Sequence, residues 1–324
     1  MTAPLTAPEL RDIEDAAVRI RPFAHRTPVF TCGAINRRVD AQLFFKCENF
    51  QKVGAFKFRG ACNAVMSLSE EAARAGVATH SSGNHAAALA LAARLRHTTA
   101  HIVMPDNAPA VKRAAVEGYG GRIRFCQPTL AAREATLAEV VAETGATVVH
   151  PYNDPRVIAG QGTAALELLE DVADLDVILA PVGGGGLLSG TAIATKGLSP
   201  RTRVIAAEPA GADDARRSLA EGRIVPSVNP RTIADGLLTS LGDLTFPIIQ
   251  QHVEAIVAVS EEAIVAAMRL IWERMKIVVE PSAAVPLGAL VEGALDVSGR
   301  RVGVILSGGN VDLNNLPWAI RASS

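Results

Sequence analysis

Short apolar runs rich in β-branched residues alternate along this chain with longer stretches whose apolar residues recur at helical spacing. Several of the short runs are continuously apolar, which is typical of strands covered on both faces. The alternation predicts an α/β fold of mostly parallel sheets flanked by helices. The predicted strands are Leu43–Cys47, Val77–Ser81, Ala100–Met104, Arg122–Cys126, Thr147–His150, Val177–Val182, Arg203–Glu208, Ala255–Val259 and Val302–Ser307. The predicted helices include Asn84–Arg94, Leu130–Glu143, Gly160–Asp171 and Glu261–Met275.

An amphipathic helix is predicted close to the N-terminus. Leu10, Ile13 and Ile20 fall on one helical face. Thr6 followed by Glu9 has the spacing of a capping box, so we expect this pair to start the helix. The charged residues between positions 8 and 20 do not fit the apolar core of a signal peptide.

The strands fall into two series, which predicts two domains. The strands that begin near residues 77, 100, 122 and 147 form one compact series. We expect residues 75–150 to form a small mobile domain, inserted into a large domain of residues 1–74 and 151–324. A cleft between such domains, at the carboxyl ends of strands, is where ligands usually bind.

Composition narrows the functional class. The chain has 324 residues, of which 49% are hydrophobic, and a formal net charge of -1. This balance offers no basic surface for nucleic acid or for a membrane, and no apolar run is long enough to span a bilayer. The four cysteines are scattered and form no CxxC pair, which favours a reduced, cytoplasmic setting.

One lysine stands out, in the segment from Phe50 to Gly60. Lys57 lies between Phe56 and Phe58, after a glycine and before a stretch that favours helix. An apolar setting makes a charged amine costly, so the pKa of such a lysine tends to fall. A neutral amine is what a carbonyl cofactor needs in order to form a Schiff base. Most lysines beside apolar residues are solvated, so this segment indicates a cofactor site only in combination with other loops of the chain.

A run of four glycines, Gly183, Gly184, Gly185 and Gly186, follows a predicted buried strand and opens a predicted helix. Consecutive backbone N–H groups and a helix N-terminus can together bind a phosphate. The run is not followed by the Lys-Ser or Lys-Thr of a Walker loop. Glu208 lies far enough downstream that a nucleotide- or NAD-binding loop remains an alternative, as does a plain flexible turn.

Two polar loops follow other predicted strands. Residues 80–85 read His-Ser-Ser-Gly-Asn-His, and residues 307–312 read Ser-Gly-Gly-Asn-Val-Asp. The first loop can cap the next helix and can also bind a carboxylate at the helix start. The second loop, taken alone, reads as a simple turn. The five-residue spacing of His80 and His85 does not suit two metal ligands on one helical face.

Taken together and in order, these loops resemble those of the fold-type II pyridoxal-phosphate enzymes, whose fold is that of the tryptophan synthase β subunit. The resemblance is to the group of serine racemases and of serine, threonine and 3-hydroxyaspartate dehydratases, and it spans about Ile20 to Leu313. The stretches that carry it are Phe45–Gln51, Gly54–Ala61, Ser81–His85, Ile158–Thr163, Gly183–Gly186 and Ser307–Asn310. It implies a lyase that eliminates water from a β-hydroxy amino acid to give a 2-oxo acid and ammonia. A serine racemase is the near alternative.

The resemblance also implies roles for individual residues. Lys57 holds the cofactor as a Schiff base and acts as a base. The other cofactor-binding residues are Phe56 beside the pyridine ring, Asn84 at its 3-hydroxyl, Gly183, Gly184, Gly185 and Gly186 at the phosphate, and Ser307 at the ring nitrogen. The substrate carboxylate meets Ser81, Ser82, Gly83, Asn84 and His85.

Two of these residues bear on the reaction. A serine beside the ring nitrogen stabilises a protonated ring less than a carboxylate does. This favours prompt loss of a β-substituent. Ser82 matches the serine that serves as the second acid/base in racemases, so it permits racemisation at the opposite face.

The resemblance adds a metal site and a selectivity residue. Glu208, Asp214 and the carbonyl of Ala212 match the oxygen ligands of a Mg2+ ion, or of Mn2+ or Ca2+. By pattern alone this stretch is a solvated acidic turn. Arg133 matches an arginine that faces the cleft and can take a second carboxylate, which favours 3-hydroxyaspartate or serine.

The chain also departs from the group. Thr239 replaces a serine in the substrate-adjacent loop that contains Gly236, which leaves the preferred side chain open. Val53 replaces a threonine and weakens the case for a nucleotide activator. A homodimer that acts on a small amino acid is the expected state.

Overall fold

The computed structural model describes residues 6–108 and 110–319 and contains two sheets. The larger sheet has six strands in the order β1-β2-β10-β7-β8-β9. β1 pairs antiparallel with β2, and all other pairs are parallel. The strands are β1 (Val29–Phe30), β2 (Gln42–Cys47), β7 (Val177–Pro181), β8 (Arg203–Pro209), β9 (Ala255–Val259) and β10 (Arg301–Leu306).

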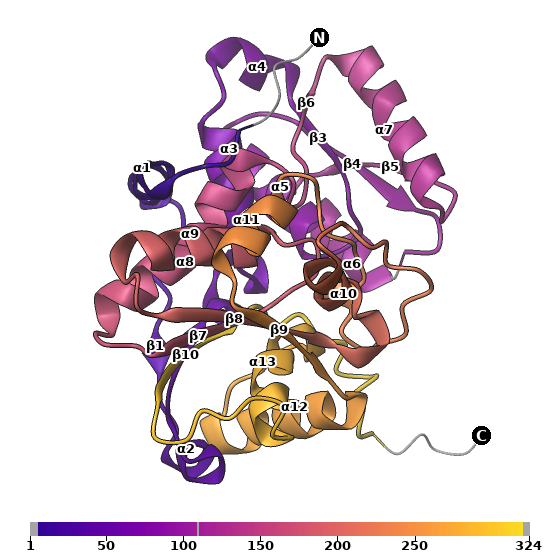
Figure 1. The fold of residues 1–324 in the computed structure, drawn as a ribbon. Coiled ribbons are helices and arrows are strands. Elements are labelled where there is room, and N and C mark those ends of the chain that lie inside the picture. Colours follow the sequence, from indigo (N-terminus) through magenta and orange to yellow (C-terminus); the bar gives the residue numbers. More distant parts are fainter. Residues whose placement is uncertain (1–5, 109, 320–324) are drawn as a thin grey trace, which may run out of the picture.

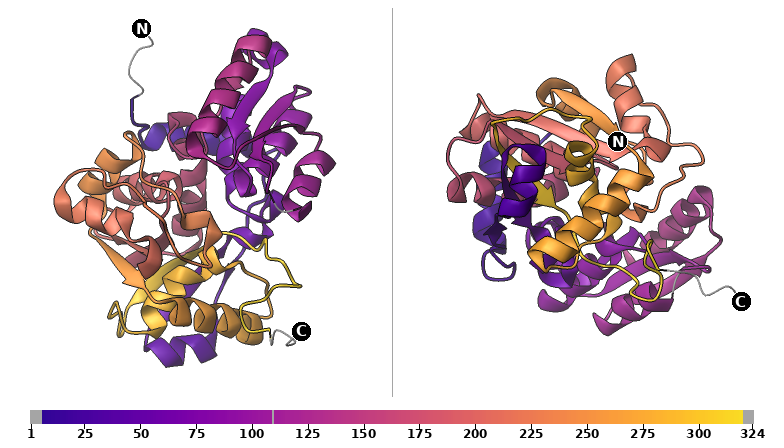
Figure 2. Two further views of the ribbon diagram at one scale, coloured as in Figure 1. Left: turned by 90° about the vertical axis from the view of Figure 1, so that its right-hand side faces the viewer. Right: turned by 90° about the horizontal axis from the view of Figure 1, so that it is seen from below.

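The smaller sheet has four parallel strands in the order β5-β4-β3-β6. Figures 1 and 2 show this sheet and its helices side by side with the larger sheet, as a separate layer of the molecule. The α/β prediction of mostly parallel sheets is confirmed, whereas the domain limits at 75 and 150 and the mobility of the small domain stay predictions. The strands are β3 (Val77–His80), β4 (Ala100–Pro105), β5 (Arg122–Cys126) and β6 (Thr147–Val148).

Helices cover both sheets. In the larger sheet α13 packs on one face and α9 on the other, and α8 packs along α9. The helices are α1 (Leu10–Ile20), α2 (Gly33–Val39), α3 (Lys57–Met66), α4 (Glu70–Ala75), α5 (Asn84–Leu95), α6 (Ala110–Gly118), α7 (Leu130–Thr144), α8 (Pro155–Asp171), α9 (Gly186–Leu198), α10 (Asp214–Glu221), α11 (Thr245–His252), α12 (Glu261–Met275) and α13 (Pro281–Val291). Short 3-10 helices occur at Glu48–Phe50, Lys52–Gly54, Ala210–Ala212 and Asp235–Leu237.

The central strands of the larger sheet are buried, as their continuously apolar sequences predict. Every residue of β7 is buried, and β10 is buried after its first residue. Helices lie on both faces of these strands, so apolar side chains are favoured on both faces. No helix within residues 6–108 and 110–319 combines the length and the apolar character needed to cross a bilayer.

The start of the first helix differs from the prediction. α1 begins at Leu10 with Glu9 as its N-cap, and the Asp12 carboxylate accepts a hydrogen bond from the Glu9 N–H at 2.7 Å. Thr6 is therefore not the cap. The chain offers the same three-residue spacing twice, and the acidic pair one turn further on forms the capping box.

Four of the predicted strands extend too far at their carboxyl ends. β3, β7 and β10 end one residue earlier than expected, and β6 ends at Val148. Ser81, Val182 and Ser307 therefore lie in the loops that follow the strands. These loops carry the candidate site.

Candidate active site

Lys57 is the first residue of α3 and lies at the junction of the two sheets. Its Nζ donates a hydrogen bond to the carbonyl oxygen of Pro151 at 2.8 Å and lies 5.1 Å from the centre of the Phe56 ring. Burial lowers the pKa of Lys57 to about 8, and the opposing effect of the Glu280 carboxylate is smaller. The neutral amine is therefore a larger minority near neutral pH than in a free lysine, and this neutral form is what nucleophilic attack on an aldehyde requires.

A buried ionic cluster fixes the helix that carries Lys57. The Arg59 guanidinium donates to Glu48 through Nε at 2.7 Å and to Glu167 through Nη1 at 2.7 Å. Lys46 Nζ donates to the same Glu167 at 2.6 Å. Arg59 and Lys46 are fully buried, so each positive charge has a carboxylate within reach. The cluster joins β2, α3 and α8 immediately behind Lys57.

The four-glycine run forms the turn from β7 into α9. Gly184, Gly185 and Gly186 are buried, and Gly185 is the N-cap with a φ of 91°. Within the described chain, the backbone hydrogen bonds give the N–H groups of residues 183–186 no acceptor. Buried N–H groups without partners are costly, and an anion at a helix start satisfies them.

The space beside this turn excludes side chains. A Cβ atom on Gly184 would lie 2.3 Å from the ring of Tyr152, and one on Gly183 would lie 3.0 Å from the Cα of Leu237. The unpartnered N–H groups and the close neighbours fit a bound phosphate group.

Asn84 is the first residue of α5 and reaches across to the larger sheet. Its Nδ2 donates to both carboxylate oxygens of Glu280, at 3.0 and 3.2 Å, and its Oδ1 accepts from Asn310 Nδ2 at 2.9 Å. Burial raises the pKa of Glu280 to about 7, with a smaller raising effect from Asp235. Sequence reasoning missed Glu280, although it precedes Pro281 at the start of α13, a usual position for an acidic residue. Asn310 lies in the polar loop singled out at residues 307–312, but no role was assigned to it.

The remaining residues of the loop before α5 are mostly accessible. Ser81, Ser82 and Gly83 are half-buried, and the Ser81 hydroxyl accepts from the Gly83 N–H at 3.4 Å. His85 is buried with its Nε2 3.1 Å from the carbonyl oxygen of Val149. The His85 side chain thus faces backbone, which leaves the serines and the backbone N–H groups to meet a ligand.

Ser307 follows β10 and is buried, at 2% exposure. Its carbonyl oxygen accepts a hydrogen bond from the Phe56 N–H at 3.0 Å, one residue before Lys57. The bridge between Ala55 and Gly308 joins the same two segments. Ser307 and Lys57 are therefore neighbours, although 250 residues separate them in the sequence.

Three aromatic side chains, those of His80, His150 and Tyr152, pack together, and the Lys57 charge acts on the middle one, His150. The rings of His80 and His150 meet edge to face at 6.2 Å, and those of His150 and Tyr152 at 4.6 Å. Arg133, in α7, is half-buried, and its charge lowers the pKa of His80, although burial has the larger effect. The Arg133 Nε is buried without a hydrogen-bond partner among the described residues. Sequence reasoning missed His150 and Tyr152.

Gly236 lies in the loop that closes over the glycine run. Its N–H donates to the Ser282 hydroxyl at 3.0 Å. The carbonyl oxygen of Gly236 would lie 3.2 Å from a Cβ on Gly183. The loop that contains Gly236 and the glycine run therefore touch, and the role of Gly236 in substrate binding stays a prediction.

The acidic loop after β8 brings two carboxylates together. Glu208 is buried and accepts from the N–H groups of Ala215 at 3.2 Å and Arg216 at 2.6 Å. Burial raises the pKa of Glu208 to about 8 and that of Asp214 to about 6. Asp214 Oδ2 is buried with no hydrogen-bond partner in the described chain.

These carboxylates fit a hard cation, which would neutralise them and occupy the unpartnered oxygen. No cluster of three or more His, Cys, Asp or Glu side chains suited to a metal occurs within the described ranges. A cation here therefore needs backbone oxygens such as the Ala212 carbonyl.

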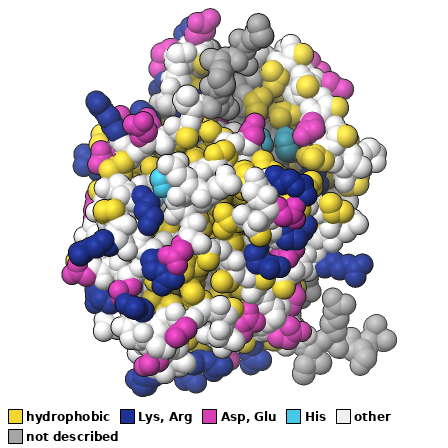
Figure 3. All heavy atoms as spheres, in the orientation of Figure 1, with side chains coloured by type: hydrophobic (Ala, Val, Ile, Leu, Met, Phe, Trp, Pro, Cys, Tyr) yellow, Lys and Arg dark blue, Asp and Glu magenta, His cyan; other side chains and the backbone are white. Residues whose placement is uncertain are grey.

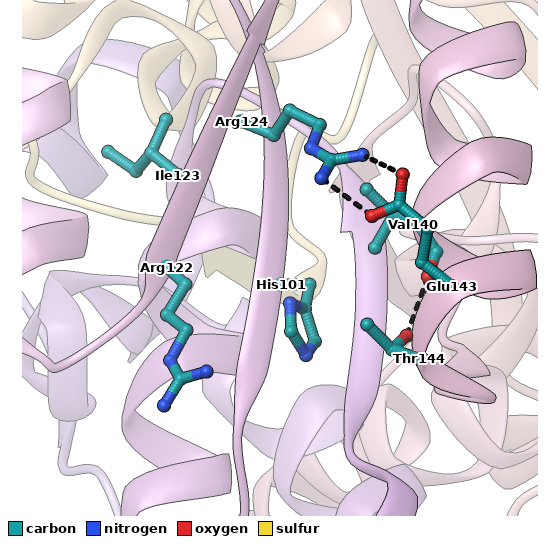
Figure 4. Close-up of a pocket in the computed structure, with 7 residues that line it drawn as sticks. All are labelled: His101, Arg122, Ile123, Arg124, Val140, Glu143 and Thr144. Carbon is teal, nitrogen blue, oxygen red and sulfur yellow. Dashed lines mark hydrogen bonds and ion pairs between the residues drawn. The ribbon is translucent and has the colours of Figure 1, made fainter.

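A surface hollow lies away from these loops. Figure 4 shows it between β4, β5 and the C-terminal part of α7, where Arg124 is bonded to Glu143 by two hydrogen bonds. None of the predicted site residues lines it. On the face drawn in Figure 3, charges of both signs are interspersed.

Comparison with known proteins agrees with this geometry. The family model described as "Pyridoxal-phosphate dependent enzyme" matches residues 20–308. The chain is 54% identical over 311 residues to the β-hydroxyaspartate dehydratase of Paracoccus denitrificans, covering 96% of this chain and 99% of that protein. It is 49% identical over 319 residues to the serine racemase of Dictyostelium discoideum, covering 97% and 98%.

Solved structures agree as well. The structure of maize serine racemase superposes with a TM-score of 0.93 at 48% identity, covering 95% of this chain and 95% of that one. A nicotinamide role for the glycine run is therefore set aside. The chain belongs to the family of pyridoxal-phosphate dependent enzymes.

Proposed function

We propose that this enzyme is an ammonia-lyase that removes water from a β-hydroxy amino acid and releases a 2-oxo acid and ammonia. The observation that carries the proposal is the position of Lys57. Its amine has a pKa lowered to about 8 and lies between an aromatic ring and loops with unpartnered polar groups. A positioned amine of this kind can bind an aldehyde and move a proton.

Each neighbouring group has a role in this proposal. Gly183–Gly186 bind the phosphate, Phe56 packs by the ring, and Asn84 and Ser307 contact its polar atoms. The cofactor supplies an electron sink for the bonds at the substrate Cα. Lys57 takes the proton from Cα, and the loop of Ser81–His85 receives the substrate carboxylate at the start of α5.

The preferred substrate is 3-hydroxyaspartate, with L-serine and L-threonine as poorer ones. Arg133 supports this preference, because its half-buried guanidinium has an Nε atom without a partner among the described residues. A second carboxylate would satisfy that donor. The Paracoccus denitrificans dehydratase carries β-hydroxyaspartate in its name, which agrees with this choice.

A divalent cation completes the proposal. Glu208, Asp214 and the carbonyl of Ala212 hold Mg2+, or Mn2+ or Ca2+, and the ion stabilises the loop between β8 and α10. We further propose a cytoplasmic homodimer whose small domain, residues 75–150, moves on substrate binding.

The test is an oxo-acid assay of cofactor-loaded enzyme. L-threo-3-hydroxyaspartate, L-serine and L-threonine are compared with Mg2+ and with EDTA. We expect fast oxaloacetate release, slower pyruvate and 2-oxobutyrate release, and loss of activity in EDTA. Borohydride should quench an absorption band at about 410 nm, as a Schiff base requires. Release of no oxo acid from any substrate would refute the lyase proposal.

Serine racemase is the second candidate. Ser82 supports it, because this half-buried hydroxyl lies in the loop between β3 and α5 where a second acid/base would act. The Dictyostelium discoideum relative is a serine racemase. Chiral analysis for D-serine separates the two functions. D-serine formed faster than pyruvate would favour the racemase.

A further inference from the structure

Three histidines lie near Lys57, and their ring nitrogens have different partners. His85 Nε2 lies 3.1 Å from the carbonyl oxygen of Val149 and is engaged there. His80 has no hydrogen bond within the described residues that would fix its proton on one nitrogen. His150 differs from both, because two backbone N–H groups point at its Nδ1.

The tautomer of His150 follows from those contacts. Its Nδ1 accepts from the N–H of Asn153 at 2.9 Å and from the N–H of Tyr152 at 3.3 Å. A nitrogen that accepts from backbone N–H carries no proton, so the ring proton lies on Nε2. Burial, then the charges of His80 and Lys57, lower the pKa of His150 to about 4. His150 is therefore a neutral donor through Nε2 at physiological pH.

That donor is free to meet a ligand. His150 is half-buried, and Nε2 has no acceptor among residues 6–108 and 110–319. Nε2 is also absent from the fully buried unpartnered polar atoms of these ranges, so it stays accessible. The ring is held edge to face between His80 and Tyr152, which restricts where the N–H can point.

The place of His150 relates it to the reaction. The next residue, Pro151, provides the carbonyl oxygen to which Lys57 Nζ donates at 2.8 Å. The Lys57 charge also contributes to the lowered pKa of His150, so the ring lies near the amine and near the substrate bonds that change, which are those at Cα and Cβ.

We propose that His150 is a catalytic residue that donates a hydrogen bond from Nε2 to the β-hydroxyl oxygen of the substrate and orients it for departure. The inference rests on the proposed lyase function. Lys57 removes the proton from Cα, and the electron pair of that bond forms the Cα–Cβ double bond. The Cβ–O bond breaks with its electron pair on oxygen, which receives the proton from Lys57 and leaves as water. His150 keeps its own proton throughout.

The test compares two substrates that give the same oxo acid. L-serine loses a hydroxyl group, which needs hydrogen bonding and a proton. β-Chloro-L-alanine loses chloride, which accepts hydrogen bonds weakly and leaves without a proton. A donor to the leaving oxygen should therefore matter for L-serine alone.

Two substitutions separate the two ring nitrogens. His150→Asn keeps an acceptor where Nδ1 lies and removes the distal donor. We expect kcat/KM for L-serine to fall about 100-fold and that for β-chloro-L-alanine to change by less than about threefold. His150→Gln places an N–H near the Nε2 position and should recover part of the L-serine activity. His101→Asn, on β4 and lining the hollow of Figure 4, is the matched control and should leave the ratio unchanged.

A second readout does not depend on activity. Nitrogen-15 NMR of the labelled histidines identifies the His150 ring as the one whose signals vanish in His150→Asn, and that ring should carry its proton on Nε2 at neutral pH. Vanishing signals that belong to the opposite tautomer would overturn the inference.

Equal losses for both substrates in His150→Asn would also overturn it and would make His150 a support for the loop. A wild-type enzyme that releases no oxo acid from either substrate, or from 3-hydroxyaspartate, would instead refute the proposed function, and the inference with it.

Discussion

The groups at the ends of the larger sheet differ in burial from those at the ends of the smaller sheet. Gly184–Gly186, Glu280 and Ser307 are buried, whereas His80, Ser82 and Arg133 are half-buried. The buried set contacts parts of the molecule fixed by the core, such as the Phe56 N–H and the ring of Tyr152. The residues of the half-buried set are each partly exposed to solvent. Buried groups with fixed partners suit the binding of a cofactor whose structure does not vary. Partly exposed groups suit selection among different substrates.

Replacing Lys57 tests the larger-sheet side of the comparison most severely. Lys57→Ala removes the amine, so we expect the oxo-acid rate to fall at least about 1000-fold.

In the wild type, cofactor loading should speed up as pH rises towards about 8, because the neutral amine increases up to the lowered pKa of Lys57. The absorption band at about 410 nm follows loading. A loading rate that keeps rising towards the pKa of a free lysine would contradict this environment.

Replacing Arg133 tests the half-buried side. Arg133→Met should raise KM for 3-hydroxyaspartate about 100-fold, because a carboxylate would lose its charged partner. L-serine has no second carboxylate, so its KM should hardly change. Arg122→Met, in the hollow of Figure 4, is the control. Equal changes for both substrates would place Arg133 outside the substrate contact.

A smaller effect is expected at the glycine run. Gly184→Ala places a Cβ 2.3 Å from the ring of Tyr152, so one of them must move. Overpacking of about 1–3 kcal/mol weakens cofactor affinity by about fivefold or more. Titration of the apoenzyme with pyridoxal phosphate measures this. Gly118→Ala, where a Cβ meets nothing within 4 Å, should bind normally.

The smallest effect concerns pH and stability. The pKa of Glu280 is raised from 4.5 to about 7. Its contribution to stability is therefore present at low pH and is lost as pH rises through about 7. Glu280→Gln should flatten the fall of the apoenzyme Tm between pH 5 and pH 8, whereas exposed Glu262→Gln should not. An unchanged pH profile would mean that Glu280 titrates normally.

Sequence reasoning succeeded where chemistry is local. The strand at Val177 is a continuous apolar run, and the glycine run and Lys57 stand in short contiguous segments. It failed where a contact is distant. Glu280 meets Asn84 across 196 residues, and no local pattern predicts that pair. His150 and Tyr152 were missed for the same reason, since their roles depend on rings and N–H groups placed by the fold.

The ionic cluster behind Lys57 has a consequence for the order of folding. Arg59 is satisfied only when Glu167 arrives, 108 residues later in the chain. Until then the Arg59 guanidinium lacks one of its carboxylates, so burying it by docking α3 is energetically unfavourable. Long-range closure of this kind is slow compared with helix formation. In a chain that emerges from the ribosome, the folded environment of Lys57 is therefore complete only after α8 has been synthesised. During the first half of synthesis Lys57 lacks this environment.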